Sequence, residues 1–334
     1  MRAGERNGLT DVVGLRVGHA SLSGPGARSG TTVVLAPPGG AVAGVDVRGA
    51  APGTRETDLL APTATVQRVH AVTLSGGSAY GLDAASGVMA RLERDGEGFP
   101  VPGAVVPIVP AAVVFDLGRG GDPRARPTAE TGAAAYDDAR SPAGAGPVAQ
   151  GSVGAGTGAV SGGLRGGIGS ASAVLDGGTV VAALVVLNSA GTAADLRTGE
   201  VHGARHGLAG EFDGAGTAPP DRLAELYAAH VNPLGTATTL VVVATDAALD
   251  KAGCTRLATM AHDGLARAIS PVHTIRDGDC AFALSTGTAP APDTAVLVAL
   301  QAAAADVTAR AVAHALLAAR EAPDRPSYRS LVGG

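Results

Sequence analysis

Short runs of apolar, mostly β-branched residues recur along the chain and predict its strands. Runs of about four to eight such residues, bounded by small residues, are typical of strands buried in a sheet. The predicted strands cover residues 12–17, 31–35, 43–47, 71–74, 105–109, 111–117, 179–187, 240–245 and 280–284.

Apolar residues at helical spacing separate several of these strands. In residues 75–96 a turn leads into a helix, because Leu82, Val88 and Leu92 fall on one helical face. Ser78 is the expected cap of that helix. Further helices are expected at residues 130–137, 221–230, 250–269 and 294–320. Since strands and helices mix throughout, the pattern predicts an α/β or α+β protein of stacked layers.

The composition restricts what the core can be made of. The chain has 334 residues, enough for one large domain or two small ones. Only 2% of the residues are aromatic, none is Trp, and 50 are Gly. The core must therefore consist of Ala, Val, Leu and Ile, with helices and sheets in close backbone contact.

Charge and hydropathy argue against nucleic-acid and membrane partners. The net charge is −5 and Lys251 is the single lysine, so no basic surface for a nucleic acid is expected. Polar side chains interrupt the most apolar segment, residues 295–319, and the N-terminus lacks the apolar core of a signal peptide. These features predict a cytoplasmic protein.

The two cysteines give no sign of a metal or redox site. Cys254 and Cys280 lack CxxC spacing, so neither a zinc site nor a disulfide framework is indicated. We therefore expect the protein to need no metal and no cofactor.

A glycine-rich run at residues 151–172 raises the alternative of nucleotide binding. Gly154, Gly156 and Gly158 resemble a phosphate-binding loop, but no Lys-Ser or Lys-Thr pair follows them. A second group of glycines stands where a Rossmann helix would begin. The preferred interpretation is close backbone packing around a pocket, with Arg165 projecting between the glycines.

The segment 235–246, GTATTLVVVATD, places two threonines at the mouth of a buried strand. If the bond before Thr238 were cut, its hydroxyl and its new α-amine would belong to one residue. The amine could then act as base for the hydroxyl. A polar, Gly- and Pro-rich segment precedes Thr238, and an exposed connection is expected there. Thr is also a common strand residue, so the pattern alone leaves both interpretations open.

Ser78 is a second candidate nucleophile. GGSAY at residues 76–80 approaches the Gly-x-Ser-x-Gly elbow, with a strand before it and a helix after it. Tyr80 is too bulky for the last position of that elbow, which favours the helix-capping role instead.

Polar residues stand at the ends of two more predicted strands. Asn188 ends the strand 179–187, where its amide could donate to an oxyanion. Asp277 and Asp279 flank Gly278 just before the strand 280–284. These carboxylates could bind a cation, or hold an ammonium and a hydroxyl in place. A solvated turn and an ordinary strand end are the structural alternatives.

These signals fall into one pattern, because the chain resembles the L-aminopeptidase/D-esterase family, which includes the β-peptidyl aminopeptidases and the nylon-oligomer hydrolase. The resemblance covers nearly the whole length, with the motifs in the family's order. They are LTDVVGLRVGHAS (9–21), GVDVRGAAPGTRETDLL (44–60), VTLSGGSAYGLDAASGVM (72–89), LRGGIGSAS (164–172), LVVLNSAG (184–191), TTLVVVATDAAL (238–249), MAHDGLARAI (260–269) and PVHTIRDGD (271–279).

The resemblance implies a fold and a maturation step. The implied fold is a four-layer α/β/β/α sandwich of the aminopeptidase/ornithine acetyltransferase-like type, with residues 1–334 as one hydrolase domain. The family implies self-cleavage into an α subunit, residues 1–237, and a β subunit, residues 238–334. A homo-oligomer of these αβ units is expected.

The resemblance also assigns roles to site residues. Thr238 matches the nucleophile that cleavage exposes, and Asn188 matches the asparagine that stabilises the oxyanion. Asp277 and Asp279 match the pair that orients the nucleophile and its amine. Arg165 falls where the nylon-oligomer hydrolase type has lysine.

Two departures from the family pattern bear on these roles. Ala237 precedes the nucleophile, where members often have Asn or Gly, which bears on the rate of self-cleavage. Arg165 does not readily lose a proton, so it can supply only charge and hydrogen bonds.

The expected function is therefore a self-processing N-terminal-threonine amide hydrolase. It is expected to act as an aminopeptidase on short peptides or amides, with a free amino end on the substrate. Acyl transfer of the ornithine acetyltransferase type is the alternative on the same fold, and a nucleotide-binding module is a further one. The sequence leaves open the physiological substrate, its stereochemistry and the number of subunits.

Overall fold

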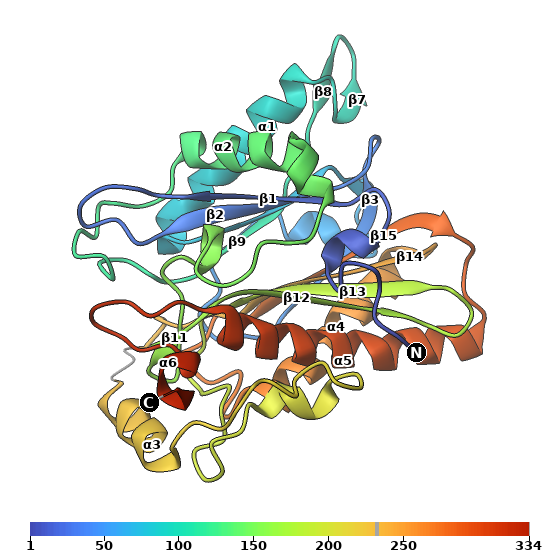
Figure 1. Cartoon of the computed structure of the whole chain (residues 1–334). Helices are drawn as coiled ribbons and strands as arrows, with labels where there is room; N and C mark the ends of the chain where they lie inside the picture. Colours follow the sequence, from blue (N-terminus) through green and yellow to red (C-terminus); the bar gives the residue numbers. More distant parts are fainter. Residues whose placement is uncertain (231–233, 334) are drawn as a thin grey trace.

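Two β-sheets lie face to face between two layers of helices (Figure 1). This computed structural model describes residues 1–230 and 234–333. Helices α1 and α2 cover the outer face of one sheet, and α4 and α5 cover the outer face of the other. The predicted four-layer α/β/β/α sandwich is confirmed.

The first sheet has the strand order β1-β2-β6-β9-β4. The helices outside it are α1 (Ala84–Arg94) and α2 (Ala129–Arg140). A small hairpin of two strands, β7 and β8, projects beyond α1 (Figure 1). The strands are β1 (Arg16–Ser21), β2 (Gly30–Leu35), β4 (Thr54–Arg55), β6 (Ala71–Ser75), β7 (Phe99–Val101), β8 (Ala104–Val106) and β9 (Ala111–Val113).

The second sheet has the strand order β12-β13-β14-β15-β3-β5. Its outer face is covered by α4 (Lys251–Ala268) and α5 (Thr294–Ala318), while α3 (Pro220–Ala229) and α6 (Tyr328–Val332) lie at one end (Figure 1). The strands of this sheet are β3 (Ala41–Val47), β5 (Arg68–Val69), β12 (Gly167–Val174), β13 (Val180–Leu187), β14 (Leu240–Ala247) and β15 (Cys280–Ala289). Strands β10 (Val160–Ser161) and β11 (Leu164–Arg165) form a separate hairpin.

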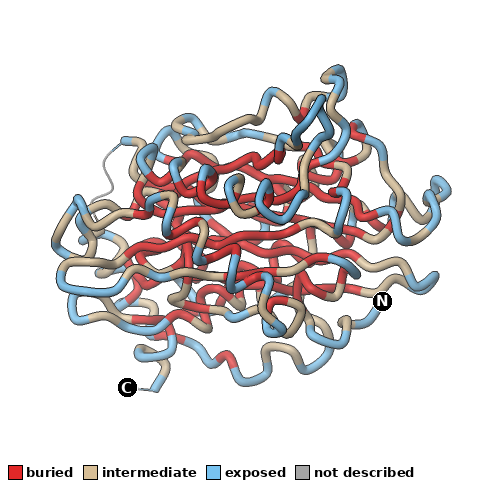
Figure 2. The backbone as a smooth tube through the Cα atoms, turned by 90° about the horizontal axis from the view of Figure 1, so that it is seen from above, coloured by how far each residue is buried: buried red, intermediate tan, exposed pale blue. Residues whose placement is uncertain are grey.

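Small aliphatic side chains fill the space between the sheets, as the composition predicts. Leu74 of the first sheet and Leu184 of the second belong to one buried cluster, and Figure 2 shows the strands buried at the centre. Close backbone packing is confirmed between α1 and α2. A Cβ on Gly87 or Gly132 would collide with the backbone of the other helix.

The sequence pattern was wrong for several local elements. β12 lies inside the glycine-rich run, and its Gly, Ser and Ala residues carry no hydrophobic alternation that would mark a strand. The first strand begins at Arg16, because a turn that follows the 3-10 helix Leu9–Asp11 takes up the start of the predicted run, residues 12–17. Ser78 does not cap a helix through its side chain. It has a positive φ of 52° and opens a 3-10 helix, Ser78–Asp83, whose N-cap is Gly77.

Helix α5 is, among the described residues, the one helix long and apolar enough to cross a membrane by length and composition. Over half of its most apolar stretch, 56%, is buried in protein. Because α5 packs on β12 and β13, it is a core helix of this fold.

Candidate active site

Three neighbouring strands bring the predicted polar residues to one edge of the second sheet. β13 runs antiparallel to β14, and β14 runs parallel to β15. Val186, Leu240 and Cys280 are therefore aligned across the three strands. The residues just beyond them, Asn188, Thr238 and Gly278, meet where β13 ends and the other two strands begin.

Thr238 lies two residues before β14 and is only 4% exposed. Its hydroxyl donates to the carbonyl oxygen of Ala237 at 2.5 Å. Its backbone N–H donates to the backbone carbonyl of Asn188 at 2.7 Å. The atom that would become the α-amine after cleavage is therefore already held by a backbone acceptor.

The exposed connection predicted before Thr238 ends before it reaches the Ala237–Thr238 bond. Leu234 is 68% exposed, but Ala237 is only 1% exposed. Ala237 pairs as a parallel bridge with Asp277, so the segment enters the sheet before the threonine is reached. The prediction was wrong here because composition does not record strand pairing.

Gly278 is a site residue that the sequence analysis passed over. Its backbone N–H donates to the Ala237 carbonyl oxygen at 2.9 Å. A Cβ at this position would lie 2.8 Å from the Thr238 Oγ and closer still to the carbonyl of Ala51. The absence of a side chain at Gly278 thus makes room for the Thr238 hydroxyl. The only sign of this role in the sequence was a glycine between two aspartates.

Asp277 and Asp279 are both buried, and each holds a backbone segment in place. Asp279 Oδ1 accepts the N–H of Thr239 at 2.6 Å. Asp277 Oδ1 accepts the N–H of Ala190 at 3.0 Å, and its Oδ2 accepts from Thr274. Burial, followed by the neighbouring charge of Asp279, raises the pKa of the Asp277 carboxyl above its ordinary value.

Asp279 also reaches a pair of histidines. Its Oδ2 lies 2.7 Å from Nδ1 of His273, and the rings of His273 and His262 meet edge to face with centroids 4.8 Å apart. Burial lowers the pKa of His262. The loop after β3 closes the other side, where Gly49 and Ala51 donate backbone N–H groups to the carbonyls of Asp279 and Asp277.

The side chain of Asn188 is fully buried and points to a loop of the first sheet. Its Nδ2 donates to the carbonyl of Phe115 at 3.3 Å, and its Oδ1 accepts from the N–H of Val160 at 3.1 Å and from Arg119. In this uncut state the side-chain amide is therefore occupied by the protein, and the backbone carbonyl of Asn188 touches the nucleophile.

Arg119 is a second residue that the sequence analysis missed. Its guanidinium donates to Asn188 Oδ1, to the carbonyl of Gly158 at 2.8 Å and to the carbonyl of Thr236 at 3.4 Å. Burial lowers the pKa of Arg119 to about 10, so it carries its charge at neutral pH. It lies in a Gly-rich loop without periodicity, and the sequence gives no signal for its contact with the site.

The structure does not bring Arg165 into hydrogen-bonding contact with the other predicted residues. Its guanidinium donates to the carbonyl of Thr157 at 2.6 Å, to Ser152 Oγ at 3.2 Å and to the carbonyl of Arg320 at 3.2 Å. Burial, followed by the charge of Arg28, lowers its pKa to about 10. Arg165 and Arg119 hold the adjacent carbonyls of residues 157 and 158, so Arg165 lies behind the group that contacts Asn188.

The glycine-rich run does not form a phosphate-binding loop. Residues Gly154–Gly156 form a buried 3-10 helix. The N–H groups of Gly154 and Ala155 donate to the hydroxyls of Ser21 and Thr32. Because these donors are used by β1 and β2, they are not available to a phosphate.

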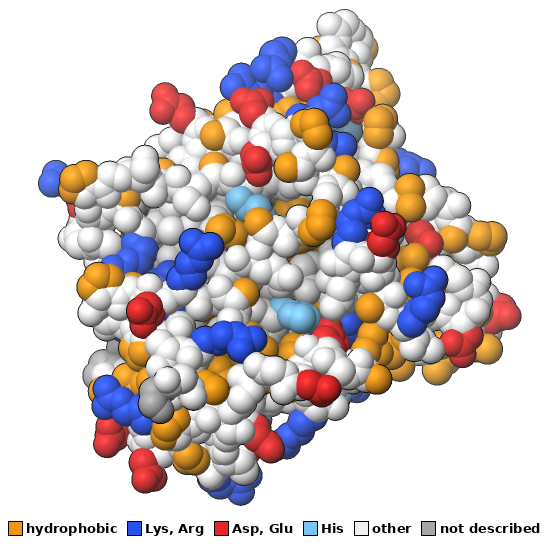
Figure 3. All heavy atoms as spheres, in the orientation of Figure 1, with side chains coloured by type: hydrophobic (Ala, Val, Ile, Leu, Met, Phe, Trp, Pro, Cys, Tyr) orange, Lys and Arg blue, Asp and Glu red, His pale blue; other side chains and the backbone are white. Residues whose placement is uncertain are grey.

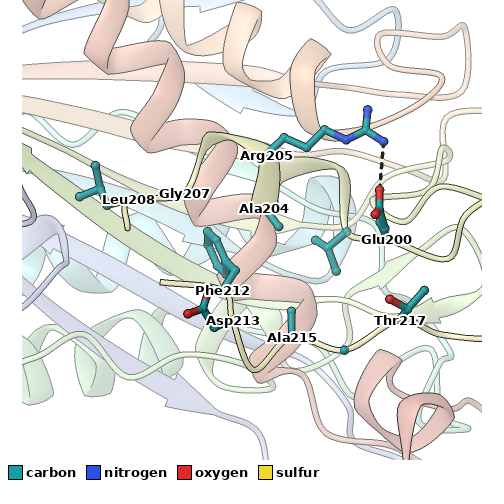
Figure 4. A pocket seen from close by; sticks show the side chains of 11 residues that line it. Glu200, Ala204, Arg205, Gly207, Leu208, Phe212, Asp213, Ala215 and Thr217 are labelled. Carbon is teal, nitrogen blue, oxygen red and sulfur yellow. Dashed lines mark hydrogen bonds and ion pairs between the residues drawn. The ribbon is translucent and has the colours of Figure 1, made fainter. Parts of the chain in front are cut away.

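The described residues hold no cluster of three or more His, Cys, Asp or Glu side chains able to bind a metal ion. Figure 3 shows acidic and basic side chains interspersed over one face of the molecule. A cavity of about 450 Å³ lies elsewhere, in the loop of residues 200–217, where Arg205 and Glu200 form an ion pair and Phe212 contributes an apolar wall (Figure 4). None of the five predicted site residues lines this cavity.

Comparison with known proteins gives consistent matches. Residues 7–328 match peptidase family S58. A protein of Mycobacterium tuberculosis named as an uncharacterized aminopeptidase is 48% identical over 98% of both chains. The 6-aminohexanoate-oligomer endohydrolase of Paenarthrobacter ureafaciens is 32% identical over 85% of this chain and 76% of its own.

Two solved structures share the fold. A β-aminopeptidase of Burkholderia superposes with a TM-score of 0.73 at 25% identity, covering 98% of this chain and 90% of that one. The L-aminopeptidase D-Ala-esterase/amidase of Ochrobactrum anthropi, titled as a variant of the Ntn hydrolase fold, gives a TM-score of 0.73 at 24% identity, covering 97% and 90%. The second likeness shows the fold alone.

Proposed function

The chain belongs to peptidase family S58 and is a hydrolase of amide bonds, and from that premise we propose that it is a self-processing aminopeptidase-type enzyme with Thr238 as its nucleophile. The observation that carries the proposal is the geometry at the Ala237–Thr238 bond. The Thr238 hydroxyl lies against the preceding carbonyl, whose oxygen also accepts the N–H of Gly278 at 2.9 Å.

Self-cleavage begins with attack of Thr238 Oγ on the carbonyl carbon of Ala237. The Gly278 N–H stabilises the negative charge that develops on the carbonyl oxygen. The C–N bond then breaks and the hydroxyl proton passes to the nitrogen, which leaves an ester between Ala237 and Thr238 Oγ. Water hydrolyses the ester and releases residues 1–237 from the chain that begins at Thr238.

The new α-amine serves as base in the mature enzyme. Its nitrogen stays beside the Asn188 carbonyl, which accepted its N–H at 2.7 Å before cleavage. With a reference pKa of about 7.7–8.0, an α-amine is partly unprotonated near neutral pH and can take the Oγ proton. Asp279 fixes the next residue through the N–H of Thr239 at 2.6 Å, which holds the hydroxyl in register.

Substrate turnover repeats the same chemistry on an external amide. Thr238 Oγ attacks the substrate carbonyl, the amine leaves with the proton, and water hydrolyses the acyl-enzyme. In this step the second N–H of the Asn188 side-chain amide, whose first N–H donates to the Phe115 carbonyl, is proposed as an oxyanion donor to the substrate that replaces the cut segment. Short peptides or amides are the proposed substrates, as the names of the relatives suggest.

Intact-mass measurement on the purified protein tests this proposal. Cleavage before Thr238 gives chains of 237 and 97 residues, and the smaller chain should read Thr-Thr-Leu-Val from its N-terminus. A chain that stays whole under all conditions, or a fragment that starts elsewhere, would contradict the assignment. A rise in product with an added amine acceptor would instead support acyl transfer.

Assembly and location remain predictions. We propose that the αβ units form a homo-oligomer, which the exposed apolar start of α5 supports, since Val298 is 62% exposed. We also propose that the protein is cytoplasmic. Sedimentation of the mature protein measures the number of units, and cell fractionation measures the location.

A further inference from the structure

Asp279 holds the proposed nucleophile from its C-terminal side. Its Oδ1 accepts the backbone N–H of Thr239 at 2.6 Å, and Thr239 directly follows Thr238. This bond fixes the direction of the peptide group between the two threonines. The position of the Thr238 hydroxyl therefore depends on where the Asp279 carboxylate points.

His273 holds the other oxygen of this carboxylate. Asp279 Oδ2 lies 2.7 Å from His273 Nδ1, and the Asp279 side chain is only 1% exposed. Because a carboxylate has no proton to give, Nδ1 of the imidazole is the donor. A buried carboxylate oxygen that loses its donor is strongly unfavourable. Without His273, the carboxylate is expected to turn toward another donor and away from Thr239.

The ring of His273 is itself fixed by a second imidazole. It meets the ring of His262 edge to face, with centroids 4.8 Å apart. His262 is fully buried on α4, and its Nε2 lies 2.9 Å from the backbone carbonyl of Asp46 at the end of β3. Burial lowers the pKa of His262, which keeps this ring neutral at pH 7. The contacts thus run from β3 and α4 through His273 to Asp279.

The backbone of His273 lies in the left-handed region, with a φ of 53°. Residues with a Cβ rarely adopt such a φ, and Gly, Asn and Asp adopt it most readily. In the part of the chain that the structure describes, His273 Nε2 has no hydrogen-bond partner. The strained residue therefore makes one polar side-chain contact there, the bond from Nδ1 to Asp279. An observed backbone outlier of this kind motivates a functional hypothesis.

From these contacts we infer that His273 is a positioning residue of the proposed reaction, which acts through Asp279 to hold Thr238 in place for attack. The inference rests on the proposed function. His273 does not contact the reacting atoms in the uncut chain, so it is assigned no proton transfer. Residues 239, 262, 273 and 279 all follow the cleavage site, so they stay in one chain after the cut. The same contacts can therefore serve both self-cleavage and substrate turnover.

His273→Gly and His273→Asn test the inference as a pair. Both residues tolerate the φ of 53°, but only Asn keeps an N–H donor close to the place of Nδ1. The rate of self-cleavage and the kcat for Ala-p-nitroanilide should fall at least about tenfold in H273G, since a displacement of about 1 Å can cost about 10²-fold. KM should change much less, because the arrangement of the reacting atoms acts on the transition state. H273N should restore most of both rates.

Equal rates in the wild type and H273G would overturn the inference. So would an H273N variant as slow as H273G, because the donor to Asp279 would then have no effect. If H273G fails to fold, His273→Leu takes its place, since Leu keeps bulk beside His262 but carries no donor. Equal rates in H273L and H273N would likewise overturn the inference.

A double-mutant cycle with Asp279→Asn shows whether His273 acts through the carboxylate. The self-cleavage rate of each variant is followed by intact mass. If His273 acts through Asp279, H273G should slow the D279N chain little further. Losses that multiply in the double variant would indicate an independent structural role and would contradict the inference.

His314→Ala is the matched control for loss of a histidine that bonds a buried carboxylate. His314 lies 2.8 Å from Glu211 and its side chain is 22% exposed, against 19% for His273. It lies on α5 and bonds none of the proposed site residues. We expect H314A to melt earlier and yet to keep the wild-type rates of self-cleavage and turnover. A rate loss in H314A equal to that in H273G would overturn the inference, because general destabilisation would then explain both.

The wild-type protein separates failure of the inference from failure of the proposed function. A wild-type chain that stays whole and does not hydrolyse Ala-p-nitroanilide would remove both. A wild-type chain that is cut and active, with H273G equally fast, would remove only the role of His273.

Discussion

The backbone N–H of Gly278 donates a 2.9 Å hydrogen bond to the carbonyl oxygen of Ala237. The hydroxyl of Thr238 donates to the same oxygen at 2.5 Å. Two donors on one peptide carbonyl draw electron density from the carbon that the hydroxyl would attack. Because the parallel alignment of β14 and β15 fixes the Gly278 N–H, it needs no reorganisation when charge develops.

Gly278→Ala should slow self-cleavage by about 10²-fold or more, the usual effect of losing one oxyanion donor. The added methyl would lie 2.8 Å from Thr238 Oγ and force the turn away from the bond. Gly177→Ala is the matched control, since a Cβ there meets nothing within 4 Å. The fraction of cut chain with time is measured by mass spectrometry. Equal rates in both variants would count against the Gly278 donor.

Thr238→Ala should remain a single chain and lose amidase activity, because the hydroxyl is proposed to serve both reactions. Thr238→Ser should keep part of both activities, since the chemistry needs an Oγ. Intact mass and p-nitroanilide hydrolysis are measured on the same preparations. If the alanine variant were cut and active, Ser78 would become the candidate nucleophile.

Strand pairing explains how much of the site the sequence could predict. Asn188, Thr238 and the Asp277–Asp279 turn each stand at the end of a recognisable buried strand. The sequence marks the strand ends but not their order in the sheet. The convergence of these residues becomes visible only with the alignment of β13, β14 and β15.

The contributions missed at sequence level come from groups without a pattern. Gly278 acts through a backbone N–H, which every residue except Pro carries, so its identity gives no clue to the bond it makes. Arg119 reaches the site from a loop of the first sheet, across the layer boundary. β12 was missed for a related reason. Between Ile168 and Val174 it consists of Gly, Ser and Ala, so it shows no apolar alternation.

A buried ion pair ties the loop of residues 200–217 to α5 and predicts a large stability effect. Arg310 is fully buried and donates two hydrogen bonds, of 2.7 and 2.8 Å, to Glu211, which also bonds His314 and Asn7. Glu211→Ala should lower the free energy of unfolding by about 3–5 kcal/mol, because it leaves a buried guanidinium unpaired. Glu225→Ala, at an exposed pair on α3, should change it by about 0–1 kcal/mol. Urea unfolding of chains kept uncut by Thr238→Ala measures the change in the free energy of unfolding for each of the two Glu substitutions. Similar losses in Glu211→Ala and Glu225→Ala would contradict the role of the buried ion pair.

The effect of Glu211 should depend on pH in a defined direction. Burial by itself raises its pKa, but hydrogen bonds from His314, Arg310 and others outweigh this and hold the pKa well below the usual range. A lowered carboxyl pKa gives stability that is present above the unfolded pKa of about 4.3 and is lost as the pH falls toward the folded pKa. The difference in the free energy of unfolding between the parent and Glu211→Ala should therefore be constant from about pH 7 to 5. It should become smaller below about pH 4. A gap that widened in acid would contradict this assignment.

Asn188 offers two distinguishable roles, and two substitutions separate them. Its Oδ1 accepts from Arg119 and Val160, whereas its Nδ2 donates to Phe115 in the uncut chain and is the proposed oxyanion donor in the mature enzyme. Asn188→Asp keeps an acceptor for Arg119 but removes the donor. Asn188→Ala removes both and leaves buried partners unpaired, at a cost of about 1–3 kcal/mol of stability.

If the Nδ2 donor stabilises the oxyanion, Asn188→Asp should fold and yet lose about 10²–10³ in kcat with a much smaller change in KM, because such a donor binds the transition state more strongly than the substrate. Asn188→Ala should lose a similar factor and also melt earlier. kcat, KM and the fraction of cut chain are measured for each variant, so that slow maturation is not mistaken for slow turnover. A kcat per cut molecule within a few-fold of wild type in Asn188→Asp would show that the side chain serves only to anchor Arg119 and Val160. The oxyanion donor in substrate turnover would then have to be another group. The backbone N–H of Gly278 would be the first candidate.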